Sequence, residues 1–437
     1  MIRWTTGVLL VLAAIGAGLL ASTETTPRGV RLKIYDNLSW EGDPVETRLM
    51  KHLDYGPGFA RNPQSLPDRS SAHMDGWFYA PRGGKYEFEV EATSDVWLRI
   101  NGRTVLTHRR GTPASPGAIW LQKGFHKLRY QIRHRKGVSK FAAKWRLPSG
   151  YMTMEALPPI YVQPDKPRSG SSVPLSHRLA PLLLLVMGIL VLVGPRLAAL
   201  VRTLRSDAEL RKRFGAGLFL LVMAFGFRAW DINGAGETSD EWAYTIAGRL
   251  YVSNAGHGYF DSVYWATNEE HPPVGKYFYG LISHVVGTDS YTPLRLGSAV
   301  LGSLTVLITF MFGLRFFSLS VGFLGATILC FLPSFVAHSK VAALDSPSGF
   351  LFTLGAYLFV DALTAAPQQN RRYLSAGLVA CFAFLTKFSN VLLFVYMVAL
   401  HFVSQWRTIR RKGVMELPIP LYFLPFLPFL IMLAIWP

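Results

Sequence analysis

The chain has 437 residues, half of them hydrophobic, with a mean hydropathy of +0.24 and a net charge of +18. The hydropathy argues against a wholly soluble protein and favours a membrane protein that carries a soluble part. The charge does not require a nucleic-acid partner, because membrane proteins collect Lys and Arg in their cytoplasmic loops. Cys330 and Cys381 lie inside apolar runs, so we expect both to be packing residues rather than disulfide or metal ligands.

The N-terminal segment, residues 1–28, contains the apolar run GVLLVLAAIGAGLLA (7–21). This run predicts either a signal peptide or an uncleaved signal anchor. Under both alternatives the segment that follows leaves the cytoplasm.

Residues 29–150 alternate between polar and apolar side chains, as in KYEFEVEA (85–92), and glycine-containing turns separate the runs. This pattern predicts an antiparallel β-sandwich. The pieces VRLKIYDN, DGWFYAPRGGKYEFEVEATSDVWLRINGRTVL and WLQKGFHKLRYQIRHRKGVSKFAAKWRLPSG resemble the β-sandwich module named after the anthrax protective antigen. The resemblance implies carbohydrate binding. Where calcium-dependent members have adjacent aspartates, the loop TSDVW has Asp95 alone.

Basic residues dominate the second half of the predicted sandwich. Between 123 and 146 there is no acid, and the basic residues are Lys123, Lys127, Arg129, Arg133, Arg135, Lys136, Lys140, Lys144 and Arg146. On alternating strands they predict a cationic face that meets anionic headgroups or an acidic glycan. The alternative is a basic face that is merely solvated.

The rest of the chain is mostly apolar. Residues 151–178 have the prolines, glycines and serines of a linker, 179–214 predict one span and a basic cytoplasmic connector, and 215–437 predict a helical membrane domain. Predicted spans lie near 180–194, 215–230, 294–313, 317–336, 347–364, 373–388, 389–405 and 417–436. Lys and Arg gather in alternate connectors, which we expect to be cytoplasmic. The predicted fold is therefore a polytopic α-helical membrane protein with an extracytoplasmic β-sandwich.

The 231–290 segment is acidic although the chain is basic, and we expect it outside the cytoplasm. TSDEWAYTIAG (238–248) places Asp240 and Glu241 after an apolar run, and NEEHPPVGKYFYG (268–280) follows. The intervening helical pattern predicts a helix on the membrane surface or a buried packing helix. The two acids fit either the first turn of a helix, where the helix dipole favours them, or an active site.

Four elements in this order resemble GT-C glycosyltransferases, above all the protein O-mannosyltransferases and the bacterial lipid A aminoarabinose transferases. They are the acid pair, the acid-His-Pro-Pro-x-x-Lys element followed by an Arg at the next span, ALDSP (343–347) and FLTKFSN (384–390). The resemblance implies transfer of a sugar, with inversion, from a polyprenyl-phosphate carrier to an extracytoplasmic protein, lipid or glycan acceptor at the cell (inner) membrane.

The resemblance also implies roles for residues. Asp240 would be the base for the acceptor hydroxyl. The donor phosphate would meet the cations Lys276, Arg295 and Lys387. The acceptor or the site itself would be supported by Glu241, Glu270, His271 and Asp345. No cofactor is certain from these residues, and a divalent metal stays open because Glu270 matches an acid that holds the acceptor or a metal.

Each residue also has a structural interpretation. His271 before Pro-Pro could end a helix, Arg295 and Lys387 at span ends could reach to headgroups, and Asp345 could cap a helix. Two other functions compete with the enzyme: a transporter or flippase of lipid-linked sugars, and a non-enzymatic envelope-binding protein on a membrane anchor. Members of the resembling group usually continue for further spans, so we expect a fragment, a compact variant or one part of a split enzyme.

Overall fold

The computed structural model describes residues 28–59, 62–80, 83–146, 148, 155–157, 161–166, 203–204, 206–234, 236–257, 265, 268, 270–286, 290–365, 370–412 and 427–435. The chain divides into two compact units. The sandwich unit comprises Thr23–Leu175 and Asp261–Thr267, and the helical unit comprises Met1–Ser22, Ser176–Phe260 and Asn268–Pro437. The predicted N-terminal run 7–21 and the predicted span 180–194 lie outside the described residues.

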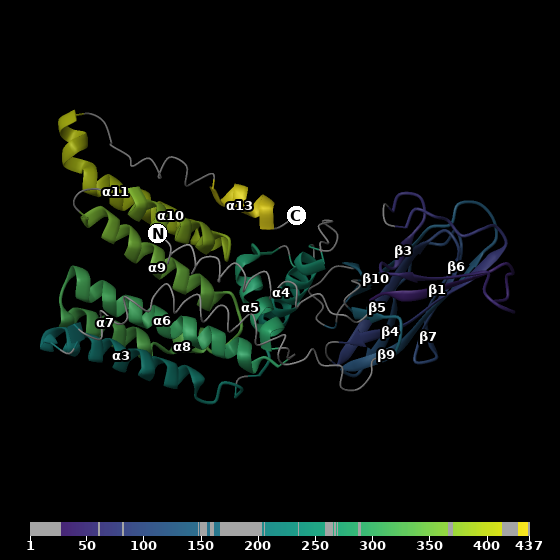
Figure 1. Cartoon of the computed structure of the whole chain (residues 1–437), viewed down its shortest axis with the longest axis horizontal. Coiled ribbons are helices and arrows are strands. Elements are labelled where there is room, and N and C mark those ends of the chain that lie inside the picture. The colour runs from purple at the N-terminus through teal and green to yellow at the C-terminus, as the bar shows by residue number, and fades with distance from the viewer. Residues whose placement is uncertain are drawn as a thin grey trace. The chain divides into compact units, whose positions relative to one another are not determined.

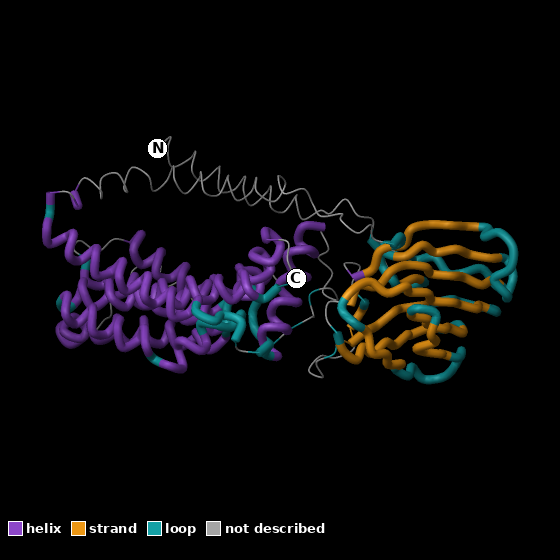
Figure 2. The backbone as a smooth tube through the Cα atoms, turned by 90° about the horizontal axis from the view of Figure 1, so that it is seen from below, coloured by secondary structure: helices purple, strands orange, loops and turns teal. Residues whose placement is uncertain are grey.

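The sandwich unit consists of two antiparallel sheets (Figures 1 and 2). One has the order β2-β1-β4-β9-β6-β7 with β12 paired to β4, and the other has the order β11-β10-β5-β8 with β3 paired to β10. The strands are β1 Val30–Tyr35, β2 Glu46–Met50, β3 Asp54–Tyr55, β4 Ser70–Ala80, β5 Gly84–Ala92, β6 Asp95–Ile100, β7 Arg103–His108, β8 Gly117–Leu121, β9 Gly124–His134, β10 Phe141–Arg146, β11 Glu155–Ala156 and β12 Val162–Gln163.

The sandwich core follows from the period-two pattern of the strands. From Leu128 onward every second residue of β9, including Tyr130 and Ile132, is buried, and the residues between them face outward. Burying one face fixes the register, because a slip by one residue would expose the apolar set. Between the sheets the ring of Phe78 meets that of Trp145 edge to face at 5.6 Å. The predicted antiparallel sandwich is confirmed.

Two details differ from the expectation. β11 and β12 lie inside the stretch 151–178 that predicts a linker, because Leu157 and Val162 are buried in the sandwich.

The basic residues between 123 and 146 do not form one face. Arg129 points outward from one sheet, where it pairs with Asp75, whereas Lys144 points outward from the other sheet and pairs with Glu91. The sequence pattern missed this division because β9 and β10 belong to different sheets.

The helical unit contains ten described α-helices and one 3₁₀ helix (Figure 1). They are α3 Ala208–Ala229, α4 Ser239–His257, α5 Val274–Val286, α6 Thr292–Phe316, α7 Leu319–Phe331, α8 Pro333–His338, α9 Asp345–Thr364, α10 Asn370–Phe384, η3 Phe388–Asn390, α11 Val391–Lys412 and α13 Leu427–Ile435. Three segments are long and apolar enough to cross a membrane: Thr292–Phe316, Asp345–Thr364 and Phe388–Trp406. They coincide with the predicted spans 294–313, 347–364 and 389–405.

Other predicted spans have different bounds. The run 317–336 is divided into α7 and α8, because Pro333 has no N–H to continue the helical ladder. The run 373–388 is helical only to Phe384, and 215–230 forms part of α3. The run 417–436 is described only from Leu427.

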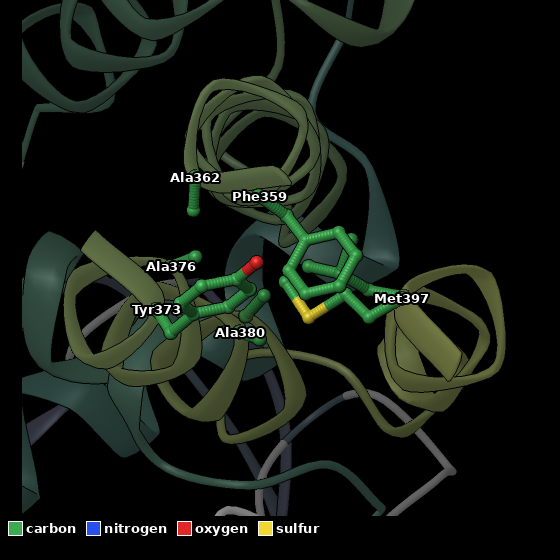
Figure 3. Packing of buried hydrophobic residues seen from close by; sticks show 8 residues of the cluster. Phe359, Ala362, Tyr373, Ala376, Ala380 and Met397 are labelled. Atoms are coloured by element: carbon green, nitrogen blue, oxygen red, sulfur yellow. The ribbon is translucent and has the colours of Figure 1, made fainter. Parts of the chain in front are cut away.

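Small residues allow the helices to pack closely. An added Cβ at Gly248 of α4 would lie 2.1 Å from the carbonyl oxygen of Lys276 in α5, and one at Gly280 would lie 2.1 Å from the carbonyl oxygen of Gly248. Helix backbones approach this closely only where side chains are absent. Elsewhere α9, α10 and α11 bury a cluster that includes Phe359, Tyr373 and Met397 (Figure 3).

Candidate functional site

Glu241 of α4 and Arg295 of α6 form a buried ion pair. Arg295 donates from Nε to Oε1 and from Nη2 to Oε2 of Glu241, both at 2.7 Å. The side chains are 0% and 4% exposed. Two parallel bonds of this kind fix the guanidinium and the carboxylate in one plane. Arg295 also donates to the carbonyl oxygens of Ile232 and Gly236, so its donors are directed into the protein.

Backbone amides complete the surroundings of Glu241. The N–H of Ala342 donates to Oε1 at 2.8 Å and that of Thr238 donates to Oε2 at 3.1 Å. Burial by itself raises the pKa of the Glu241 carboxyl, but the bonds from Arg295, Ala342 and Thr238 outweigh it and hold the pKa below its ordinary value. Glu241 therefore joins the start of α4, the start of α6 and the segment before α9.

Asp240 differs from its neighbour because its side chain is exposed in the first turn of α4. Ser239 lies beside it, with its hydroxyl 3.5 Å from Oδ1 of Asp240. One helical turn later is the phenol of Tyr244. Burial raises the pKa of Tyr244, and the carboxylates of Asp240, Glu270 and Asp345 raise it further. Three predicted acids thus lie within electrostatic range of one phenol.

The His-Pro-Pro element is held by Lys276. This lysine is fully buried, and its Nζ donates to the carbonyl oxygens of Asn268 and His271 and lies 5.6 Å from the ring centre of Tyr251. The ring of His271 lies between Tyr244 and Phe388, with centroids 6.1 Å and 6.4 Å away.

The nitrogens of His271 have unequal surroundings. Nε2 is 4.0 Å from Glu270, whereas Nδ1 is buried and has no hydrogen-bond partner among the described residues. Burial is the main reason that the pKa of His271 lies below its ordinary value. A neutral imidazole is therefore expected here at neutral pH.

Asp345 and Lys387 form the third part of the site. Nζ of Lys387 donates to Oδ1 of Asp345 at 2.9 Å, and the two side chains are 28% and 36% exposed. His338 Nδ1 is 3.8 Å from the other oxygen of Asp345. Lys387 is thus the predicted phosphate ligand that is both partly exposed and beside an acid of the site.

Gly275 explains why these elements can meet. A Cβ at this position would lie 2.6 Å from Cδ2 of Leu344 and 2.9 Å from Cγ2 of Thr386. The N–H of Val274 donates to the carbonyl oxygen of Leu385 at 3.0 Å. The absence of a side chain at Gly275 therefore brings α5 against the segments that carry Asp345 and Lys387.

The predicted site residues come from five stretches of the chain, and their surroundings differ. Asp240 and Glu270 are exposed and Lys387 is partly exposed, whereas Glu241, Lys276 and Arg295 are buried with protein partners. The two buried cations differ from the expectation of phosphate ligands, because their donors are directed at Glu241 and at backbone carbonyls.

Sequence reasoning missed two contributors to the site. Tyr244 had a signal, since a residue four positions after Asp240 shares its helix face. The amide of Ala342 had none, because backbone donors leave no mark in a sequence. In the described part of the chain, no three His, Cys, Asp or Glu side chains are grouped to hold a metal ion.

Comparisons with known proteins agree with both units. Residues 270–432 match the family model described as dolichyl-phosphate-mannose-protein mannosyltransferase, and residues 60–150 match the PA14 domain. No curated protein matches the chain.

Solved structures match over about a third of the chain. The PA14 domain of the MpAFP antifreeze protein is 13% identical with a TM-score of 0.27, covering 33% of this chain and 94% of that one. The PA14 sugar-binding domain from an RTX adhesin is 15% identical with a TM-score of 0.27, covering 32% and 99%. An anti-sigma factor domain-containing protein from Clostridium clariflavum is 18% identical with a TM-score of 0.27, covering 33% and 50%, so this chain spans about half its length.

The strand topology, the apolar helices and the two family matches support one another. The chain joins a PA14 β-sandwich to a helical region whose residues 270–432 match the dolichyl-phosphate-mannose-protein mannosyltransferase model, which describes membrane glycosyltransferases of the GT-C type.

Proposed function

We propose that this protein transfers a sugar from a polyprenyl-phosphate carrier to an acceptor on the extracytoplasmic side of a membrane that it crosses several times. The sandwich unit would bind the acceptor or a neighbouring envelope glycan. The observation that carries the proposal is that the adjacent acids Asp240 and Glu241 have different surroundings. Glu241 is held in a buried ion pair, whereas Asp240 is exposed, one helical turn before Tyr244 and within electrostatic range of Tyr244 and His271.

In the proposed reaction Asp240 takes the proton from the acceptor hydroxyl. The acceptor oxygen attacks the anomeric carbon, and the bond from that carbon to the phosphate oxygen breaks. The phosphate leaves with the bonding electrons, so the configuration at the anomeric carbon inverts. The acid of Asp240 suits this role because no cation is bonded to it among the described residues, whereas the Glu241 oxygens already accept several donors.

The departing phosphate gains negative charge and requires a cation. We propose Lys387 for this role, because its ammonium is partly exposed and needs only to exchange Asp345 for the phosphate. Lys276 and Arg295 would then position the site: Lys276 through the Asn268 and His271 carbonyls, and Arg295 through Glu241. Glu270 lies beside His271 and would hold the acceptor.

The first test is transfer from a labelled polyprenyl-phosphate sugar by membranes that contain the full chain. Asp240→Asn should lower transfer by at least ~100-fold, because it removes the base. Lys387→Gln should lower it by ~100-fold or more, because a developing charge loses its counterion. Glu209→Gln and Lys212→Gln, exposed changes in α3, serve as controls and should leave transfer unchanged. Transfer that survives Asp240→Asn would remove Asp240 as the base.

A further inference from the structure

One end of the sandwich unit is marked by strand pairs in both of its sheets. Ala80 pairs with Gly124 in one sheet, and Gly84 pairs with Leu121 in the other. The end of β4, the start of β5 and the β8–β9 turn therefore belong to the same end of the sandwich unit, which we call the tip. Pro148 lies against it, since a Cβ at Gly84 would be 2.5 Å from that of Pro148.

Aromatic side chains are exposed on either side of the tip. Among the described residues of the sandwich unit, the exposed large apolar side chains are Val45, Leu49, Trp120, Phe125 and Val138. Trp120 is 73% exposed and Phe125 is 39% exposed, and these two aromatic members both flank the tip. Phe125 packs on Tyr79 with ring centres 4.8 Å apart. Exposed Trp, Phe and Tyr are the side chains that favour the boundary between water and lipid.

The tip is also cationic. Lys85, Lys123 and Lys127 lie at it, and the stretch 121–127 contains no acid. Lys85 Nζ is 3.9 Å from Oε1 of Glu87, and the Lys85 side chain is 64% exposed. Lys85 lies directly opposite Trp120 across the β5–β8 pair. Lys beside an exposed aromatic is the combination that anionic headgroups attract, because the ammonium meets the phosphates and the ring enters the headgroup layer.

The chain enters the sandwich close to the tip. The N–H of Gly29 donates to the carbonyl oxygen of Val162, which pairs with Phe78, two residues before the end of β4. Residues 22–28 separate Gly29 from the apolar run 7–21. From residue 21 to Gly29 the chain extends to at most ~29 Å. If the run 7–21 is a membrane anchor, Gly29 is tethered within that distance of the end of the anchor.

We propose that the tip docks on an anionic lipid surface, with Trp120 and Phe125 at headgroup level and Lys85, Lys123 and Lys127 against the lipid phosphates. The docking proposal uses no feature of the sugar-transfer site, so a result against one proposal leaves the other unaffected. Docking would hold the far end of the sandwich away from the bilayer.

The full chain in nanodiscs tests the docking by spin labelling at Gln122→Cys, on the tip, and at Ala114→Cys, in a different turn. Both positions are exposed, and the native Cys330 and Cys381 are buried and stay unlabelled. In discs that contain phosphatidylglycerol, the label at 122 should gain collisions with lipid-dissolved oxygen and lose collisions with a water-soluble nickel reagent. The label at 114 should collide with the nickel reagent as often as a fully water-exposed label does.

Variants separate docking from mere proximity. Two sets of changes should restore the collisions of the label at 122 with the nickel reagent. One is Trp120→Ala with Phe125→Ala, and the other is Gln in place of Lys85, Lys123 and Lys127. Val138→Ala and Gln in place of Arg135, Lys136 and Lys140, exposed changes outside the tip, should not restore them. The proposal is overturned if the label at 122 is as accessible to nickel as the label at 114. Binding of the tip to a glycan or a protein instead of lipid would give that result in protein-free, glycan-free discs.

Discussion

At the scale of single residues, Asp240 and Glu241 illustrate how neighbours on a helix acquire different chemistry. Successive residues point about 100° apart around a helix of 3.6 residues per turn, so one can face the interior while the next faces solvent. Glu241 is the interior one, and burial of its charge is tolerated because Arg295 and two amides satisfy its oxygens.

Removing one partner of this ion pair should be costly. Glu241→Gln leaves Arg295 buried without its counter-charge, and breaking a buried pair typically lowers the free energy of unfolding by ~3–5 kcal/mol. Thermal or denaturant unfolding of the purified protein in detergent measures the loss. Glu209→Gln, which breaks an exposed pair with Arg213, should cost less than ~0.5 kcal/mol. Equal stability of both variants would show that the Glu241 pair contributes little.

The same pair sets a pH dependence. The folded pKa of Glu241 lies below the value of about 4.3 expected in the unfolded chain. Its contribution to stability is therefore present above that pH and is lost as the pH falls through the folded pKa. Glu241→Gln should accordingly lose this part of the acid sensitivity.

At the scale of elements, the close crossing of α4 and α5 depends on Gly248 and Gly280. Gly248→Ala would place a Cβ 2.1 Å from the Lys276 carbonyl oxygen, and backbone cannot yield as a flexible side chain does. We expect the two helices to separate, with a loss of ~1–3 kcal/mol or more in unfolding free energy. The thermal midpoint in detergent measures it. Gly215→Ala in α3 meets nothing within 4 Å and should be neutral or stabilising; a matching loss there would refute the packing argument.

The sequence predicts these elements unevenly, for physical reasons. Period-two alternation and long apolar runs revealed the sandwich and α6, α9 and α11, because burial imposes those patterns directly. Hydropathy did not reveal the break at Pro333, since apolar residues continue on both sides of it. Motifs named the charged members of the site, but not Tyr244 or the Ala342 amide. The burial of the charged members was not predictable, because Glu241 depends on Ala342, which is 101 positions away.

At the scale of the whole molecule, the spacing of basic connectors predicts opposite sides of the membrane for α4 and for the start of α10. A membrane-impermeant maleimide should label Ala114→Cys and Ser239→Cys in intact cells, because both positions are exposed in segments expected outside. Arg371→Cys should react only after permeabilisation. Labelling of 239 and 371 from the same side would contradict the predicted topology and, with it, the proposed side of the reaction.

The ties of Glu241 also impose an order of assembly during synthesis. Its ion-pair partner Arg295 is made 54 residues later, and the Ala342 amide 101 residues later. At ~5–20 residues per second, the carboxylate waits several seconds before Arg295 is made and longer before Ala342 is made. Until then it must stay hydrated or find temporary partners. A nascent chain can therefore form α3 and α6 early, but the donors around Glu241 are complete only when the segment leading into α9 reaches α4.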